Sequence, residues 1–130
     1  MKKMNKNKCI LTLCASEDGA SVREVLAKVG DKWSLFVLVK LAESPKHCCR
    51  FSELKRSISG ISQRMLTTTL RNLERDGMLT RQVFPEVPLR VEYQLTSLGK
   101  GILDPVRALT EWTAKNWHII KGAREKFDKK

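Results

Sequence analysis

Apolar residues first recur with helical spacing between residues 22 and 29. They fall at i, i+3, i+4 and i+7, which predicts a helix with one apolar stripe. Ser21 and Glu24 have the spacing of a capping box, so we expect the helix to begin at Ser21. Gly30 can adopt the left-handed conformation that commonly ends a helix. The pattern therefore predicts a first amphipathic helix that ends before Gly30.

The next segment, residues 33–41, is apolar almost all round, which is typical of a helix buried in a core. Asp31 is expected to cap its start. Pro45 restricts the backbone of the residue before it, so the helix should end near Ser44. Residues 46–50, Lys-His-Cys-Cys-Arg, are expected to form an exposed loop.

A short helix, a glycine turn and a longer helix are predicted next. The short helix covers about residues 51–58 and is broken by Gly60. Ser62 can cap a longer helix that runs to about Asp76, where Gly77 ends it. This order of elements is that of a helix-turn-helix.

Two extended runs, residues 79–84 and 90–95, are joined by Pro-Glu-Val-Pro and predict a β-hairpin. The second run alternates well between apolar and polar positions. The first alternates poorly and is assigned as a strand mainly because of its partner. A hairpin after a helix-turn-helix is a wing, so the expected fold class is mainly α with a small β-hairpin wing (α+β).

A long C-terminal helix is expected to follow Thr96, its cap. An apolar stripe runs along it from Leu98 to Ile120. Pro105 removes one backbone donor and is expected to kink this helix. The charged tail from Lys121 is expected to fray. No internal repeat is visible, and we expect a basic lead-in (1–15), one winged helix-turn-helix domain (16–124) and a charged tail (125–130).

Composition and charge narrow the function classes. The chain has 130 residues, of which 42% are hydrophobic, and this suits one globular domain. Its formal net charge of +11 favours a polyanionic partner. Nucleic acid is the preferred partner, and an anionic membrane surface is the weaker alternative. The remaining explanation is that the positive charge only keeps the protein soluble. No apolar run is long enough to span a bilayer, and the basic start is too short in its apolar part for a signal peptide, so a cytoplasmic location is expected.

The helix over residues 62–76 has two distinct sides on a helical wheel. Leucines cluster on one side, whereas arginines and threonines occupy the other. Arginine can pair with guanine edges or phosphates, and glutamine with adenine. The candidate DNA-binding residues are Ser62, Gln63, Arg64, Thr67, Thr68, Arg71 and, at the wing, Arg90. The alternative is an ordinary solvated face on which Glu74 and Asp76 pair with the arginines.

The order of these motifs resembles the HxlR-type subgroup of winged-helix regulators, relatives of the MarR group. The matching stretches are residues 30–33, 50–54, 60–66, 70–79, 85–88 and 91–96, and Gly99. The resemblance implies a homodimer joined by N- and C-terminal dimerisation helices and bound to a dyad-symmetric operator. The interface residues expected in such a dimer are Val22, Leu26, Leu109, Trp112, Trp117 and Ile120.

The cysteines depart from the pattern of that family. Members usually carry a cysteine just before the first helix, where this chain has Ala20. Cys14 lies six residues earlier, either as a displaced redox thiol or, the preferred interpretation, as an inert side chain. Basic neighbours of Cys48 and Cys49 could lower a thiol pKa, although ordinary loop thiols are preferred. No spacing indicates a metal site or a cofactor.

The expected function is sequence-specific, DNA-binding transcription regulation by a homodimer, with repression favoured. An enzyme is not expected, because the two histidines, His47 and His118, lie in no catalytic motif. The alternative is a thiol-based redox or electrophile sensor. A nonspecific architectural DNA binder and a protein-interaction module are less favoured, the latter because of the arginines on residues 62–76.

Overall fold

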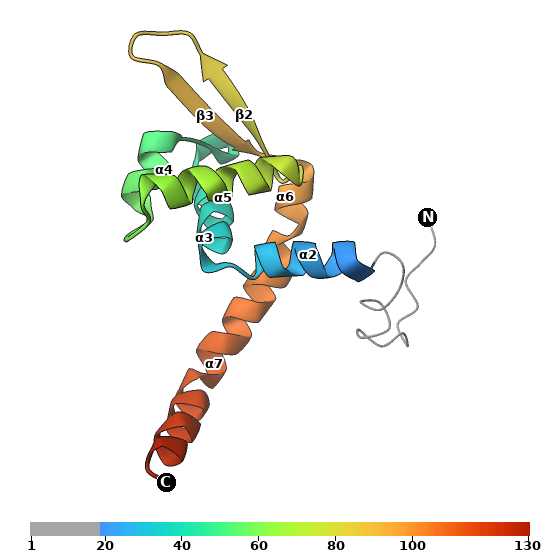
Figure 1. Cartoon of the computed structure of the whole chain (residues 1–130), viewed down its shortest axis with the longest axis vertical. Helices are drawn as coiled ribbons and strands as arrows, with labels where there is room; N and C mark the ends of the chain where they lie inside the picture. The colour runs from blue at the N-terminus through green and yellow to red at the C-terminus, as the bar shows by residue number, and fades with distance from the viewer. Residues whose placement is uncertain (1–18) are drawn as a thin grey trace.

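The computed structural model describes residues 19–130. Helices form the body, a two-stranded wing rises from it at one end, and one long helix extends away at the other (Figure 1). In chain order the elements are α2 (Gly19–Val29), α3 (Lys32–Glu43), the 3-10 turn η1 (Pro45–His47), β1 (Cys48–Arg50), α4 (Phe51–Ser57), α5 (Gln63–Arg75), β2 (Leu79–Phe84), β3 (Arg90–Leu95), α6 (Ser97–Gly101) and α7 (Leu103–Asp128). This arrangement confirms the predicted winged helix-turn-helix.

The core forms where α3 meets α4, α5 and the sheet. Val37, Leu38 and Leu41 of α3 are fully buried, which confirms the predicted core helix on this side. Phe36 and Val39, by contrast, are exposed on the other side and were not expected to be. Leu54 of α4 and Leu66 of α5 pack into the same cluster. Burial of these side chains, at about 25 cal/mol per Å² of apolar surface, holds α4 and α5 against α3.

Side-chain caps start three of the helices, as the sequence predicts. Asp31, Ser62 and Thr96 each accept a hydrogen bond from a backbone N–H in the first turn of α3, α5 and α6, at 3.3, 3.0 and 3.1 Å. The first helix differs, because α2 begins at Gly19 and Ser21 lies inside it. Alanine is the best helix former, and Ala20 lets the helix extend past the expected cap.

The sheet has three antiparallel strands in the order β1-β3-β2. The hairpin falls at the predicted residues. Residues 46–50, however, are not an exposed loop: β1 pairs with β3 through the register Cys49↔Tyr93, and Cys49 is only 3% exposed. The prediction was wrong because a three-residue strand has no measurable alternation and its partner lies far along the chain.

The expected long C-terminal helix is two helices that meet at Ile102. Pro105 has no N–H to donate to the carbonyl of Gly101, so the hydrogen-bond ladder is interrupted and a new helix starts. The structure thus has two helices separated at Ile102, where one helix with a kink was expected. α7 continues to Asp128, which contradicts the expected fraying from Lys121. No helix within residues 19–130 is long and apolar enough to cross a membrane.

Candidate nucleic-acid interface

The outer face of α5 is polar and basic. Leu66, Leu70 and Leu73 are buried against the core, so the opposite side of the helix faces solvent. Five polar side chains are exposed there, as predicted: Arg64, Thr67, Thr68, Arg71 and Arg75. Packing of the leucines therefore fixes which side of α5 is available to a partner.

The start of α5 also presents polar groups. The positive φ of Gly60, 83°, turns the chain between α4 and α5, and Ser62 and Gln63 are exposed at the beginning of the helix. The Thr67 hydroxyl donates to the carbonyl of Gln63 at 2.8 Å, so it offers a partner its methyl group and an acceptor oxygen. No such bond engages Thr68 among the described residues. Its hydroxyl is consequently able to donate.

The arginines of α5 are not neutralised by neighbouring carboxylates. The alternative of an ordinary face paired through Glu74 and Asp76 requires ion pairs with these arginines. Within residues 19–130, no ion pair joins Arg64, Arg71 or Arg75 to a carboxylate, whereas Arg90 and Arg107 do form such pairs. The face thus carries three positive charges with no carboxylate within ion-pair distance in the described part of the chain.

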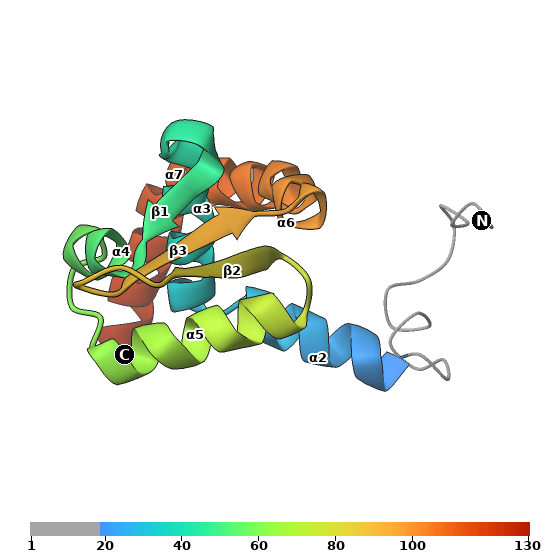
Figure 2. The same ribbon diagram turned by 90° about the horizontal axis from the view of Figure 1, so that it is seen from above.

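A hollow of about 450 Å³ lies between α5 and the hairpin. The hairpin runs back along α5, and β2 is the strand next to that helix (Figure 2). Two arginines line the hollow from opposite sides, Arg71 of α5 and Arg81 of β2. Arg81 was not among the predicted site residues. The poor alternation of residues 79–84 was the sequence signal that could have pointed to Arg81. An arginine stands on the inner face of this strand, where an apolar residue is expected.

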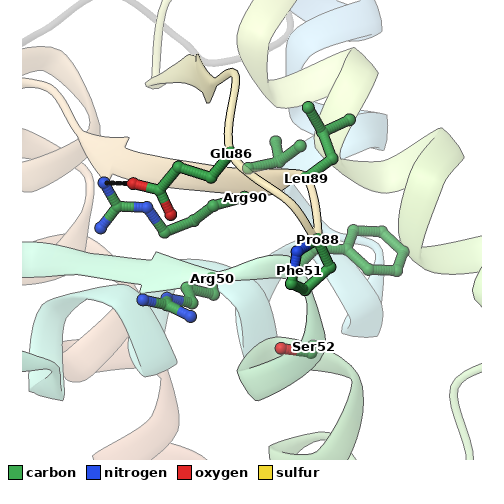
Figure 3. A pocket seen from close by; sticks show the side chains of 8 residues that line it. Arg50, Phe51, Ser52, Glu86, Pro88, Leu89 and Arg90 are labelled. Atoms are coloured by element: carbon green, nitrogen blue, oxygen red, sulfur yellow. Dashed lines mark ion pairs between the residues drawn. The ribbon is translucent and has the colours of Figure 1, made fainter.

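Arg90 is not a free cation at the wing. Its guanidinium forms ion pairs with Glu86 at 3.0 Å and with Glu92 at 3.2 Å. Figure 3 shows the side chain turned back toward Glu86. The guanidinium carbon also lies 3.8 Å from the centroid of the Phe84 ring. Only a quarter of the side chain is exposed, so the predicted contact between Arg90 and DNA competes with these intramolecular partners.

The tip of the wing is apolar. Val87 is completely exposed and Leu89 largely so, and the loop between β2 and β3 carries one charged residue, Glu86. Glu86 is already paired with Arg90. The loop at the tip therefore presents no basic side chain, and the unpaired positive charge of the wing lies nearer its base.

The residues expected at a dimer interface lie on α2 and α7, outside the core. Val22, Leu26, Leu109, Trp112 and Trp117 are between 40% and 61% exposed, and Ile120 is partly exposed. Both helices project from the body (Figure 1). A row of large apolar side chains on projecting helices is typical of a surface that associates with another chain.

The two cysteines beside the wing are poor candidates for a reactive thiol. Burial, followed by the negative charge of Glu92, raises the pKa of the Cys48 thiol. Burial, followed by the charge of Glu53, raises the pKa of Cys49. Each sulfur lies 3.6 Å from an oxygen of that carboxylate. The hypothesis that basic neighbours lower the pKa is wrong, because carboxylates and burial outweigh them.

The other predicted chemical residues form no further site. Cys14 lies outside the described residues. In the described chain, no group of three histidine, cysteine, aspartate or glutamate residues could hold a metal ion. The ring nitrogen Nδ1 of His47 lies 3.1 Å from the carbonyl oxygen of Ala42, within the turn after α3.

Known proteins share both the sequence and this geometry. Residues 28–120 match the HxlR-like helix-turn-helix family. The HTH-type transcriptional regulator YtfH of Escherichia coli (strain K12) is 42% identical over 103 residues, 79% of each chain. Among solved structures, the transcriptional regulator ytfH from Salmonella typhimurium has a TM-score of 0.72 and 41% identity, and the match covers 80% of this chain and 90% of that one.

A second structural neighbour is a redox regulator. The reduced form of HypR has a TM-score of 0.69 and 34% identity, and the match covers 78% of this chain and 98% of that one. The sequence match, the shared fold and the exposed basic helix lead to one conclusion: the chain belongs to the HxlR-like helix-turn-helix family of transcriptional regulators.

Proposed function

We propose that the protein binds double-stranded DNA as a homodimer and that each protomer places α5 in the major groove of one half of a dyad-symmetric operator. The observation that carries this proposal is the outer face of α5, with three exposed arginines that have no carboxylate partner within residues 19–130. The 13 residues of α5 give a helix about 20 Å long, which is enough to cross the groove.

The proposed interface comprises Ser62, Gln63, Arg64, Thr67, Thr68 and Arg71. Arg64 and Thr68 lie near the middle of the exposed face and suit contacts with base edges. Ser62 and the N–H groups at the start of α5 suit a backbone phosphate, because the helix dipole is positive there. Arg90 is left out, since Glu86 and Glu92 already occupy its guanidinium. A regulator of this kind acts where the chromosome lies, which for a bacterial or archaeal protein is the cytoplasm.

The test is a binding titration on an operator selected from random DNA. Loss of a two-point arginine contact costs about 1–3 kcal/mol, so Arg64→Ala should weaken binding about 5- to 150-fold per half-site and relax the preference at one base pair. Arg107→Ala is the matched control, because Arg107 is an exposed arginine on α7, away from α5. Wild-type affinity in both Arg64→Ala and Arg71→Ala would show that α5 does not read DNA.

Control of DNA binding through a thiol would depend on a cysteine other than Cys48 or Cys49, whose pKa values are raised. Cys14 is the residue to examine. If oxidant releases the wild-type protein from DNA and Cys14→Ser responds equally, Cys14 is not the sensor. We expect weak thiol control or none.

A further inference from the structure

We propose that Arg81 of β2 and Arg71 of α5 together hold one phosphate of the DNA backbone in the hollow between α5 and the wing. The inference rests on the proposed DNA-binding function and adds Arg81, which nothing above assigns to it. It also transfers the backbone contact of the wing from the tip, where Arg90 lies, to the base.

The register of the hairpin places Arg81 on the inner face of the sheet. Arg81 lies opposite Tyr93, whose side chain is buried in the core. Leu79 shares the face of Arg81 and is 1% exposed, whereas Val83, on the same face, is 42% exposed. The strand therefore leaves the core between these two residues. Arg81 is exposed although it points toward α5, because the core no longer covers the strand at that point.

Arg71 and Arg81 line the same hollow. Arg71 lines it from α5 and Arg81 from β2, with Gln63 and Thr67 as further polar groups. Glu74 also belongs to the lining, but it forms no ion pair with either arginine. Two like charges facing a shared space attract an anion, and the planar guanidinium fork matches the geometry of a phosphate.

The charge of the wing supports the same assignment. Residues 79–95 contain two arginines and two glutamates, and both glutamates pair with Arg90. Arg81 is consequently the arginine of the wing whose charge is not opposed by an ion pair within the described chain. A contact between the wing and the DNA backbone needs an available cation, and Arg81 supplies it.

The experiment compares Arg81→Ala, Arg81→Lys and the control Arg107→Ala with the wild-type dimer. Fluorescence anisotropy measures binding to a selected operator and to a scrambled duplex of equal length over a series of KCl concentrations. Arg81→Ala should weaken binding to both duplexes by a similar factor. It should also reduce the slope of log affinity against log salt, by at most about 0.9 for each half-site, because Arg71 alone neutralises the shared phosphate less completely. Arg81→Lys should keep the wild-type slope, because it keeps the charge.

A double-mutant cycle tests whether the two arginines share one phosphate. The fold-loss of DNA affinity in the double variant Arg71→Ala/Arg81→Ala should be smaller than the product of the fold-losses in the two single variants. The first substitution already weakens the contact with the phosphate, so the second removes less affinity. A wild-type slope in folded Arg81→Ala overturns the inference, and so does a loss confined to the operator, which would mark base reading. Wild-type protein that binds neither duplex would overturn both the inference and the proposed function.

Discussion

Arg90 stacks on Phe84 directly across the hairpin. The register pairs these two residues, and the guanidinium carbon lies 3.8 Å from the centroid of the ring. Glu86 and Glu92 hold the same guanidinium by ion pairs. Stacking and pairing at the point where the two strands open into the loop make Arg90 a structural residue of the wing.

Arg90→Ala should therefore loosen the end of the hairpin. Loss of the stacking interaction should cost about 0.5–1 kcal/mol and raise amide hydrogen exchange over residues 83–91. Arg81→Ala is the control, because Arg81 makes no ion pair in the described chain and should leave exchange in this segment unchanged. Equal exchange in Arg90→Ala and wild type would show that the stacked pair does not stabilise the wing.

The apolar row on α7 predicts the oligomeric state. Light scattering at micromolar concentration should give twice the chain mass of 14.9 kDa. Trp112→Glu or Ile120→Glu should weaken association by about 2 kcal/mol or more, because a charge would enter the buried interface. His118→Glu is the matched control on the opposite side of α7. A wild-type protein with the mass of one chain would contradict the proposed dimer.

The raised pKa values of the wing cysteines predict slow alkylation. In variants that retain Cys48 or Cys49 alone, iodoacetamide should react near pH 7.5 more slowly than with a free cysteine peptide, because less thiolate is present. The rate should keep rising with pH beyond about 8.5, the ordinary thiol pKa. Glu92→Gln should accelerate the reaction of Cys48 more than that of Cys49. Reaction at the peptide's rate would show that the carboxylates and burial do not protect the thiols.

Gly99 should tolerate no side chain. A Cβ at this position would overlap the carbonyl oxygen of Met78 and approach Cδ1 of Leu95 to 2.7 Å. Gly99→Ala should lower the free energy of unfolding by about 1–3 kcal/mol in urea titrations. Gly101→Ala, with nothing within 4 Å of the added methyl, should be neutral or gain up to about 1 kcal/mol. Similar stability of both variants would contradict the close packing of α6 on the chain after α5.

Local signals made most of the fold predictable. Periodicity located the helices, and the caps at Asp31, Ser62 and Thr96 are properties of neighbouring residues. β1 was missed because the partner of Cys49 is Tyr93, and only the folded chain brings them together. The break at Ile102 was expected as a kink, since the sequence shows the missing donor of Pro105 but not how the backbone responds.

The candidate site also has one part that neighbouring residues predict and another part that depends on the folded chain. The exposed face of α5 follows from the spacing of its leucines and could be predicted in full. The roles of Arg81 and Arg90 could not, because they depend on where the wing leaves the core and on how its loop brings Glu86 to Arg90. An arginine in the sequence reveals its charge, whereas its ion-pair partners depend on the fold.

The joint at Ile102 has a consequence for the spacing of operator half-sites. The Thr96 hydroxyl donates to the carbonyl of Gly77 at 2.6 Å, so α6 is tied to the end of α5, while α7 begins a separate helix. One residue inserted in α7 between Val106, which is buried against the body, and Leu109 would turn the rest of that helix by about 100° relative to α5. In a dimer joined through α7, this changes the rotational phase between the two recognition helices. Such an insertion should alter which half-site spacing the protein accepts, and not which bases each half-site requires.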